Sequence, residues 1–314
     1  MRILVVGAGA LGGYFGGRLK EAGRDVTFLV RPHRAEHLAK TGLIVRSPKG
    51  DINIPAPPTV LAENISAPFD LILLSCKAYD LQGAMDSFAP AFGANTAILP
   101  LLNGMKHMDL LAARFGAGAV LGGQCIISAT LDGEGRILHL NDLHFLSFGE
   151  QNGAKSPRVA AIAAAFSGAK FDSQLSLTIL QEMWEKWAFI AAAAGICCLM
   201  RGAFGDIAAA GGSQYASAMF AECCAIAAKN GFNPGEIAVK RSIGLLTAAG
   251  SPIAASMLRD VERGAATEAD HIVGDLLARG GARESDYPLL QIAYAHLRTY
   301  EARRQREKTA APAR

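Results

Sequence analysis

Three glycines near the start of the chain have the spacing that binds the pyrophosphate of a dinucleotide. The segment Gly7-Ala-Gly9-Ala-Leu-Gly12 fits the pattern G-x-G-x-x-G. In a dinucleotide-binding fold the first glycine makes a tight turn, the second lets the main chain approach the pyrophosphate, and the third lets the helix pack on the strand. The helix N-terminus then faces the phosphates. We therefore predict that these glycines, with Ala10 and Leu11, bind a cofactor.

The residues on either side of this motif predict the strand and the helix that it needs. Residues 3–6 are apolar and favour a strand. Apolar residues then recur at helical spacing at Leu11, Phe15 and Leu19, until Gly23 ends the pattern. A strand before the glycines and a helix after them supply the context without which the motif is weak evidence. The alternatives are a glycine-rich core turn and a signal peptide, but the glycines interrupt any apolar signal segment and no small-x-small cleavage site follows.

The end of the second predicted strand, residues 25–30, indicates which nucleotide is bound. An NAD-preferring site usually has Asp or Glu about twenty residues past the glycines, where it holds the ribose 2′-hydroxyl. No acid follows this strand before Glu36; Arg31 stands at the strand end and Arg34 follows it. A guanidinium suits a 2′-phosphate, so we predict NADP (NADPH) as the cofactor and Arg31 as its ligand. The alternative is an ordinary surface arginine.

Two polar residues come directly after further predicted strands. Lys77 follows the apolar segment 69–76, and Asn103 follows the segment 97–102. In open α/β sheets, ligands bind at the carboxyl ends of the strands, so both residues are candidates for the same site. The alternatives are an exposed loop lysine and a turn-forming asparagine before Gly104.

The order of the patterns predicts an α/β protein with two domains. We expect a Rossmann-type, NADP-binding domain over residues 1–172 and an all-α domain over residues 173–314, because strand patterns stop and alanine-rich helical patterns begin near residue 173. Within the first domain the patterns predict a hairpin at residues 43–55 and an antiparallel extension of the sheet at residues 120–149, with turns at Asp132-Gly133 and Asn141-Asp142. They also predict a helix at residues 157–166 and a short closing strand at residues 170–172.

Two stretches of the second domain carry charged residues that are candidates for the functional site. The helix that begins it has an apolar stripe, and Lys186 lies off that stripe just before the helix becomes apolar all round. The alternative is a solvated pair of Glu182 and Lys186, worth about 0.3 to 0.5 kcal/mol. Farther along, Thr267 and Asp270 read as a capping-box-like pair that begins a helix. Glu268 would then lie in the first turn, where the plain alternative is a surface acid stabilised by the helix dipole.

The composition predicts a soluble globular protein. The 314 residues are 51% hydrophobic and 19% charged, with a net charge of +3. The longest apolar run, residues 187–200, would span about 21 Å as a helix, short of a bilayer of roughly 30 Å. The six cysteines lack ligand spacing, so we expect reduced core thiols, a cytoplasmic location and no metal site. Basic residues near the C-terminus are typical of a solvated helix end and indicate no nucleic-acid partner: Arg303, Arg304, Arg306 and Lys308.

Taken together, these motifs resemble the ketopantoate reductase (2-dehydropantoate 2-reductase) family over essentially the whole chain. They are, in chain order, Gly7-Ala-Gly9-Ala-Leu-Gly12-Gly-Tyr, Arg31, Ser75-Cys-Lys77-Ala-Tyr, Leu102-Asn103-Gly104, Trp184-Glu-Lys186, Ser256 with Asp260, and Thr267-Glu268-x-Asp270. The resemblance implies a C-terminal domain like that of 6-phosphogluconate dehydrogenase and a substrate cleft between the domains. It also implies NADPH-dependent reduction of ketopantoate to pantoate, as in pantothenate biosynthesis.

The resemblance also implies roles for single residues. Lys186 matches the family's catalytic lysine, and the chemistry asks for one: hydride addition to a keto acid leaves an alkoxide, which a cationic lysine can stabilise and protonate. Glu268 matches an acid that contacts the substrate and influences that lysine. Asn103 and Ser256 match substrate-binding positions, and Lys77 matches a lysine near cofactor and substrate. Lys77, Asn103 and Glu268 are also expected to contact the cofactor.

One departure from the family pattern concerns the substrate. Family members usually carry asparagines four and eight residues after the catalytic lysine, where Ile190 and Ala194 stand here. The main alternative is therefore an NADPH-dependent reductase of another branched 2-oxo acid. A nonenzymatic NADP-sensing protein is a further alternative, although a sensor has no need of a proton donor. We expect a small-molecule substrate, no membrane partner, and possible homodimer formation through an apolar helix face that the sequence does not locate.

Overall fold

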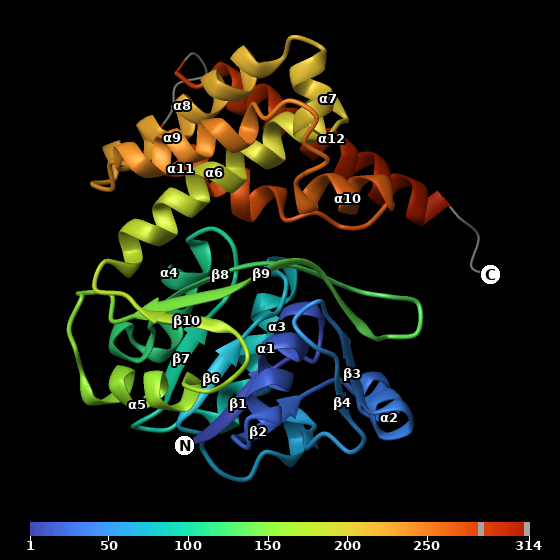
Figure 1. The fold of residues 1–314 in the computed structure, drawn as a ribbon, viewed down its shortest axis with the longest axis vertical. Helices are drawn as coiled ribbons and strands as arrows, with labels where there is room; N and C mark the ends of the chain where they lie inside the picture. Colours follow the sequence, from blue (N-terminus) through green and yellow to red (C-terminus); the bar gives the residue numbers. More distant parts are fainter. Residues whose placement is uncertain (282–285, 311–314) are drawn as a thin grey trace. The chain divides into compact units, whose positions relative to one another are not determined.

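A computed structural model describes residues 1–281 and 286–310 of the chain, which divides into two compact units (Figure 1). The first unit contains Met1–Leu102 and His107–Ile179. The second contains Asn103–Lys106 and Leu180–Arg314. The short segment after the strand at 97–100 therefore groups with the second unit.

A parallel sheet forms the centre of the first unit. Its strand order is β5-β2-β1-β6-β7, and every pair in it is parallel. The order reverses direction between β1 and β6, which is the topological switch point at which such sheets bind nucleotides. The strands are β1 (Arg2–Val6), β2 (Asp25–Leu29), β5 (Thr59–Val60), β6 (Leu71–Leu74) and β7 (Ala97–Pro100).

The first unit also contains α-helices, of which the sequence patterns predicted the first and the last along the chain. They are α1 (Ala10–Glu21), α2 (Pro32–Thr41), α3 (Leu81–Phe88), α4 (Lys106–Phe115) and α5 (Pro157–Phe166). Short 3₁₀ turns are η1 (Ala62–Asn64), η2 (Ala78–Asp80), η3 (Ala89–Ala91) and η4 (Ala117–Ala119).

A second sheet lies in the same unit, and here the sequence prediction was wrong. The chain from 120 to 149 does not extend the first sheet with short strands. It forms two long strands that pair with each other and join strands from two other parts of the chain. The members are β3 (Leu43–Arg46), β4 (Ile52–Ile54), β8 (Gly122–Leu131), β9 (Ile137–Gly149) and β10 (Asp172–Leu175).

The physical reason for the long strands is that only one of the two predicted turns forms. The Asp132 carboxylate accepts hydrogen bonds from the main-chain N–H groups of Glu134 and Arg136, both at 2.9 Å, and so closes the turn between β8 and β9. Asn141 instead lies inside β9. Its side-chain oxygen accepts from the Ser128 N–H at 3.1 Å, next to a register shift in β8, and so replaces a missing ladder bond.

Helix α1 approaches both sheets closely because its buried face includes glycines. A Cβ atom at Gly16 would lie 2.6 Å from the Phe28 ring of the first sheet. One at Gly13 would lie 2.3 Å from Ile137 of the second sheet. The helix thus approaches both sheets more closely than a larger residue would permit, and the core of the unit forms around it.

The described residues of the second unit form helices joined by loops and contain no strand. Its helices are α6 (Ile179–Met200), α7 (Phe204–Ala209), α8 (Ser213–Lys229), α9 (Glu236–Leu246), α10 (Ser256–Glu262), α11 (Asp275–Gly280) and α12 (Pro288–Ala310), with one π-helix, η5 (Asp270–Gly274). By length and composition alone α6 could cross a membrane, but 67% of its apolar window is buried inside the structure. We therefore interpret α6 as the core helix of this unit.

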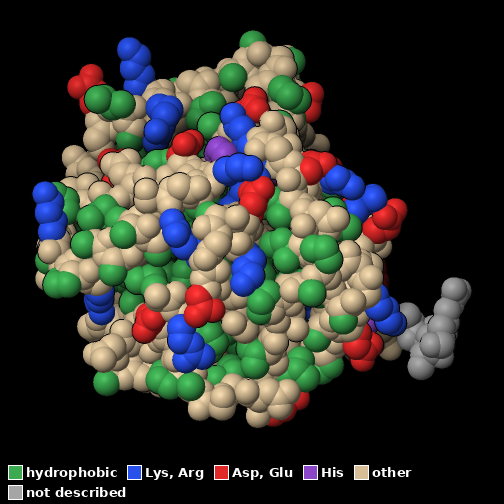
Figure 2. Space-filling model, turned by 60° about the horizontal axis from the view of Figure 1, so that its bottom comes forward, with side chains coloured by type: hydrophobic (Ala, Val, Ile, Leu, Met, Phe, Trp, Pro, Cys, Tyr) green, Lys and Arg blue, Asp and Glu red, His purple; other side chains and the backbone are tan. Residues whose placement is uncertain are grey.

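Figure 2 shows one face of the molecule, on which basic and acidic side chains are interspersed. This mixture agrees with the net charge of +3, and no large patch of one sign stands out on the face shown.

Candidate nucleotide and substrate site

The glycine motif forms a cradle at the carboxyl end of β1. Gly7 has a φ of 92° and donates its N–H to the Leu29 carbonyl at 2.9 Å, which makes the tight turn. A Cβ atom at Gly12 would lie 2.1 Å from the Gly7 carbonyl oxygen and 2.3 Å from Ser75 Oγ, so this position accepts no side chain. A Cβ atom at Gly9 would meet nothing within 4 Å, which leaves the space above it open.

The N-terminus of α1 has the properties of an anion site. Gly9 provides no side-chain cap, and the first turn carries no acidic residue. The first-turn N–H groups of a helix have no intrahelical acceptors, and the helix dipole favours a negative charge there. The cradle therefore fits the pyrophosphate of a dinucleotide, whose main-chain ligands would be residues 9–12.

Arg31 has a partner that the sequence did not suggest. Its Nη2 donates to Asp80 Oδ1 at 2.8 Å, across 49 residues of sequence. Arg31 stands at the start of α2 and Asp80 at the end of η2, beyond β6. The hydrogen bond and charge of Asp80 raise the pKa of the Arg31 guanidinium. An acid does therefore lie beside the strand end, although it comes from the 3₁₀ turn η2 that follows another strand, β6.

Arg34, by contrast, supports the glycine loop itself. Its Nε and Nη2 donate to the Ala8 carbonyl at 3.1 and 2.9 Å, and its Nη1 lies 3.1 Å from His37 Nδ1. The side chain is half-buried, and this burial lowers its pKa. Arg34 therefore uses its Nε, Nη1 and Nη2 groups on the protein itself, whereas Arg31 is exposed.

Lys77 lies at the expected edge of the sheet. Val6 is in register with Leu74 of β6, so the loops that follow the two strands leave the sheet at the same edge. Lys77 is half-buried and precedes η2, and its carbonyl accepts from the Asp80 N–H at 2.9 Å. The turn that presents Lys77 is therefore the turn that presents Asp80.

In the second unit, a buried hydrogen bond joins α6, which carries Lys186, to the π-helix that follows Glu268. Trp187 is fully buried on α6 and donates Nε1 to the Ile272 carbonyl of the π-helix at 2.8 Å. Lys186, directly before it, is half-buried, and Glu268, four residues before Ile272, is 8% exposed. Ser256 is exposed at the first position of α10.

The predicted capping box at Thr267 and Asp270 does not form. The Thr267 N–H and hydroxyl both donate to Glu301 Oε1 on α12, at 2.6 and 2.8 Å. Asp270 Oδ1 accepts from the Tyr294 hydroxyl at 2.8 Å. Both residues of the predicted capping pair therefore bond to side chains of α12. Glu268, which lies between them in the chain, is buried and is not a surface acid. The predicted helix end at Gly264 is confirmed: α10 ends at Glu262, Arg263 is its C-cap, and Gly264 follows with a φ of 68°.

His271 is a residue of this region that the sequence analysis missed. It is 7% exposed and contacts the segment that carries Asn103: a Cβ atom at Gly104 would lie 3.0 Å from His271 Cδ2. Burial lowers the pKa of His271, while Glu268, Asp275 and a hydrogen bond to the Asn103 main chain act to raise it. Asn103 and Glu268 thus face the same imidazole. No spacing in the sequence could have indicated this, because the two segments are far apart in the chain.

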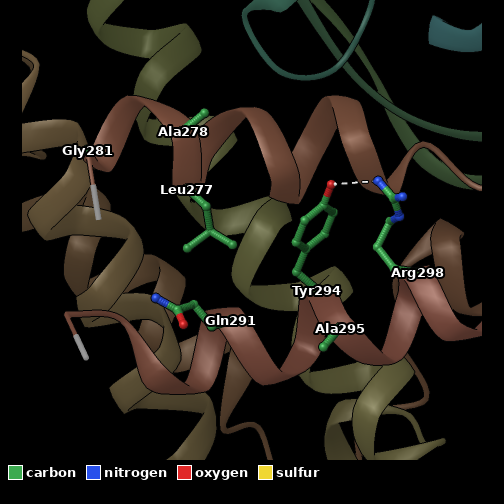
Figure 3. Close-up of a pocket in the computed structure, with 7 residues that line it drawn as sticks. All are labelled: Leu277, Ala278, Gly281, Gln291, Tyr294, Ala295 and Arg298. Atoms are coloured by element: carbon green, nitrogen blue, oxygen red, sulfur yellow. Dashed lines mark hydrogen bonds between the residues drawn. The ribbon is translucent and has the colours of Figure 1, made fainter. Parts of the chain in front are cut away.

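Figure 3 shows a pocket elsewhere in the second unit, between α11 and α12. Its residues are Leu277, Ala278, Gly281, Gln291, Tyr294, Ala295 and Arg298, and Arg298 donates to the Tyr294 hydroxyl at 3.4 Å. None of the predicted site residues is among these described lining residues, so we do not assign the reaction to this pocket.

Comparison with known proteins decides the family. Residues 3–153 match the family model described as ketopantoate reductase PanE/ApbA, and residues 178–301 match the model of its C-terminal domain. The chain belongs to the ketopantoate reductase family. The resemblance predicted from the motifs and the predicted fold class are both confirmed, and the family makes this protein an oxidoreductase.

Relatives match over nearly the whole chain. An uncharacterized oxidoreductase of Bacillus subtilis, YkpB, is 39% identical over 303 residues, covering 96% of this chain and 99% of the relative. A 2-dehydropantoate 2-reductase of Halobacterium salinarum is 28% identical, covering 93% and 96%. The crystal structure of 2-dehydropantoate 2-reductase from Methylococcus capsulatus has a TM-score of 0.86 at 28% identity, covering 97% and 98%.

Proposed function

We propose that this member of the ketopantoate reductase family is a cytoplasmic, NADPH-dependent reductase of a branched 2-oxo acid. Ketopantoate is the first substrate to test. The observation that carries the proposal is that the chain contains both the glycine cradle and the half-buried Lys186. In the cradle, the space around Gly12 leaves no room for a side chain. A nonenzymatic nucleotide sensor would need the cradle and not the lysine.

The proposed chemistry assigns each candidate residue a task. NADPH, when bound, supplies the hydride for the carbonyl carbon. Lys186 stabilises the negative charge that develops on the carbonyl oxygen and donates a proton to it. Glu268 contacts the substrate and influences the lysine, as the family pattern implies.

Asn103, Ser256 and Lys77 bind and orient the 2-oxo acid. Lys77 lies at the same sheet edge as the cradle, and Arg31 stands at the start of α2 beside β2. The exposed guanidinium of Arg31 would hold the 2′-phosphate of NADPH, since guanidinium groups match phosphate geometry well.

The substrate preference follows from the positions where the family usually has asparagines. Ile190 is half-buried on α6, and Ala194 is 3% exposed. A site built to hydrogen-bond a hydroxyl can reject the analogue lacking it by roughly 10⁴ to 10⁵, whereas an apolar wall discriminates by about 10² or less. We therefore propose that branched alkyl 2-oxo acids are reduced within about a hundredfold of ketopantoate, or better.

The test is kcat/KM for ketopantoate and for 2-oxo-3,3-dimethylbutanoate, in the wild type and in Ile190→Asn. Ile190 is the better position to change, because an asparagine at the buried Ala194 would need space that the core does not offer. Ile190→Val is the control, since it changes volume without adding a polar group. A wild-type preference for ketopantoate above about 10³ would show that other residues hold the hydroxyl.

A panel of 2-oxo acids with NADPH separates the alternatives. Turnover of one of them supports the reductase and names its substrate class. Nucleotide binding without turnover of any would favour the sensor.

A further inference from the structure

The ion pair between Arg31 and Asp80 stands where a nucleotide's 2′-position would be recognised. Both residues belong to the first unit, and both side chains are open to solvent, 78% exposed for Arg31 and 38% for Asp80. We propose that Asp80 is a specificity-determining residue that narrows the preference of this site for NADPH over NADH, an inference that rests on the proposed use of a nicotinamide dinucleotide.

The first part of the argument concerns NADPH. Its 2′-phosphate carries negative charge and must approach the Arg31 guanidinium, whose Nη2 already donates to Asp80 Oδ1 at 2.8 Å. Phosphate and carboxylate would then lie within a few ångströms of each other, and like charges at that distance repel. Asp80 thus lowers the affinity that Arg31 would otherwise provide.

The second part concerns NADH, which has a hydroxyl at the same position. A carboxylate can accept a hydrogen bond from that hydroxyl, which is the role of the acid that NAD-preferring sites place after the second strand. Here the chain carries no such acid after β2, but η2 brings Asp80 to the same strand end. The site therefore contains a group suited to each nucleotide.

The pair itself offers little resistance to rearrangement. Exposed ion pairs contribute little to stability, because water screens them and ordering two side chains costs entropy. Arg31 also has several N–H donors in its planar fork, of which the contact with Asp80 uses one. Changing Asp80 should therefore alter nucleotide selectivity without disturbing the fold.

The experiment measures dissociation constants for NADPH and NADH by fluorescence titration of the full chain, in the wild type and in Asp80→Asn. We expect Asp80→Asn to bind NADPH about 3- to 10-fold more tightly and NADH equally or more weakly, so that the NADPH-to-NADH preference rises. Because the repulsion acts between exposed charges, the difference should shrink as salt is raised.

The matched control is Asp86→Asn. Asp86 is also an exposed acid of the first unit in an ion pair, with Arg114 at 2.5 Å, and its substitution changes the net charge by the same amount. We expect the control to leave the nucleotide preference unchanged. Asp80→Ser serves as a second variant if Asp80→Asn does not yield folded protein.

An unchanged preference in Asp80→Asn overturns the proposal, and so does weaker NADPH binding, which would mean that Asp80 orients Arg31 for the phosphate. A wild type that binds neither nucleotide overturns the proposed function as well. The two failures are distinguishable, because the first leaves nucleotide binding intact.

Discussion

Two charged side chains of the candidate site, Arg31 in the first unit and Glu268 in the second, differ in their exposure to solvent. The Arg31 side chain is 78% exposed and its partner comes from a short 3₁₀ turn. Glu268 is 8% exposed and lies just before a π-helix that a buried tryptophan joins to α6. Charges in water are screened and their effects are small, whereas buried charges act strongly because little solvent competes with them.

This difference suggests a division of labour. On the proposed function, the first unit would recognise the nucleotide through main-chain geometry, with exposed charges adjusting the choice of nucleotide. The second unit would carry the chemistry on half-buried and buried groups, whose removal should have the larger effects.

The largest effect is expected from Lys186→Ala. General acid catalysis typically contributes about 10² to 10⁴, so kcat should fall by about 100-fold or more while NADPH binding stays intact. The measurement is steady-state turnover together with nucleotide titration. Lys240→Ala, at an exposed lysine of α9, is the control and should change neither. Near-normal turnover in Lys186→Ala would show that Lys186 only forms a solvated helix-surface pair with Glu182.

Two glycine variants test whether main-chain geometry governs the first unit. Gly12→Ala forces a Cβ atom to within 2.1 Å of the Gly7 carbonyl, so we expect a loss of stability of about 1 to 3 kcal/mol or more together with loss of nucleotide binding. Gly9→Ala meets nothing within 4 Å and should fold normally, but its methyl group would occupy the approach to the pyrophosphate. Denaturant unfolding and nucleotide titration separate the two outcomes. Tight binding by Gly9→Ala would contradict the cradle.

Arg31→Ala should weaken NADPH binding and leave NADH almost unchanged, because only the 2′-phosphate loses a charge-assisted partner. Such a bond is worth roughly 1.5 to 3 kcal/mol, and the exposure of Arg31 places the effect toward the lower end. Dissociation constants for both nucleotides at two salt concentrations provide the check. Equal losses for NADPH and NADH would contradict the assignment.

The smallest effect is the pH dependence of stability from buried histidines. Burial lowers the pKa of His271 below its ordinary value of 6.5, so the folded state binds this proton less readily than the unfolded state does. Above pH 6.5 the residue contributes no difference, and stability falls as the pH drops below 6.5. In His271→Gln the melting temperature should fall less between pH 6.5 and pH 5.

The exposed His33→Gln is the control for this measurement. His144, whose pKa burial also lowers, should respond in the same direction in the first unit. An unchanged slope in the variants of both histidines would show that other groups govern the acid side of the stability curve.

The sequence patterns predicted the parts of the molecule that depend on neighbouring residues. The strand, glycine turn and helix at residues 2–21 formed as expected, because φ angles, helix spacing and apolar runs are local properties. The helix at Pro157–Phe166 and the hairpin of β3 and β4 formed for the same reason. The motifs also sufficed to predict the family, which the comparison confirmed. The domain boundary near residue 172 stays a prediction, although the contact units divide after Ile179.

Tertiary structure alone decided which distant groups meet. Asp80 reaches Arg31 across 49 residues, and Glu301 takes the Thr267 hydroxyl across 34. The sequence near Arg31 showed no acid, and the sequence near Thr267 predicted a capping pair. In each case a side chain from another element provides the partner instead. The reason is physical: local patterns record the conformations that neighbours favour, whereas an ion pair or a buried hydrogen bond depends on where separate strands and helices pack.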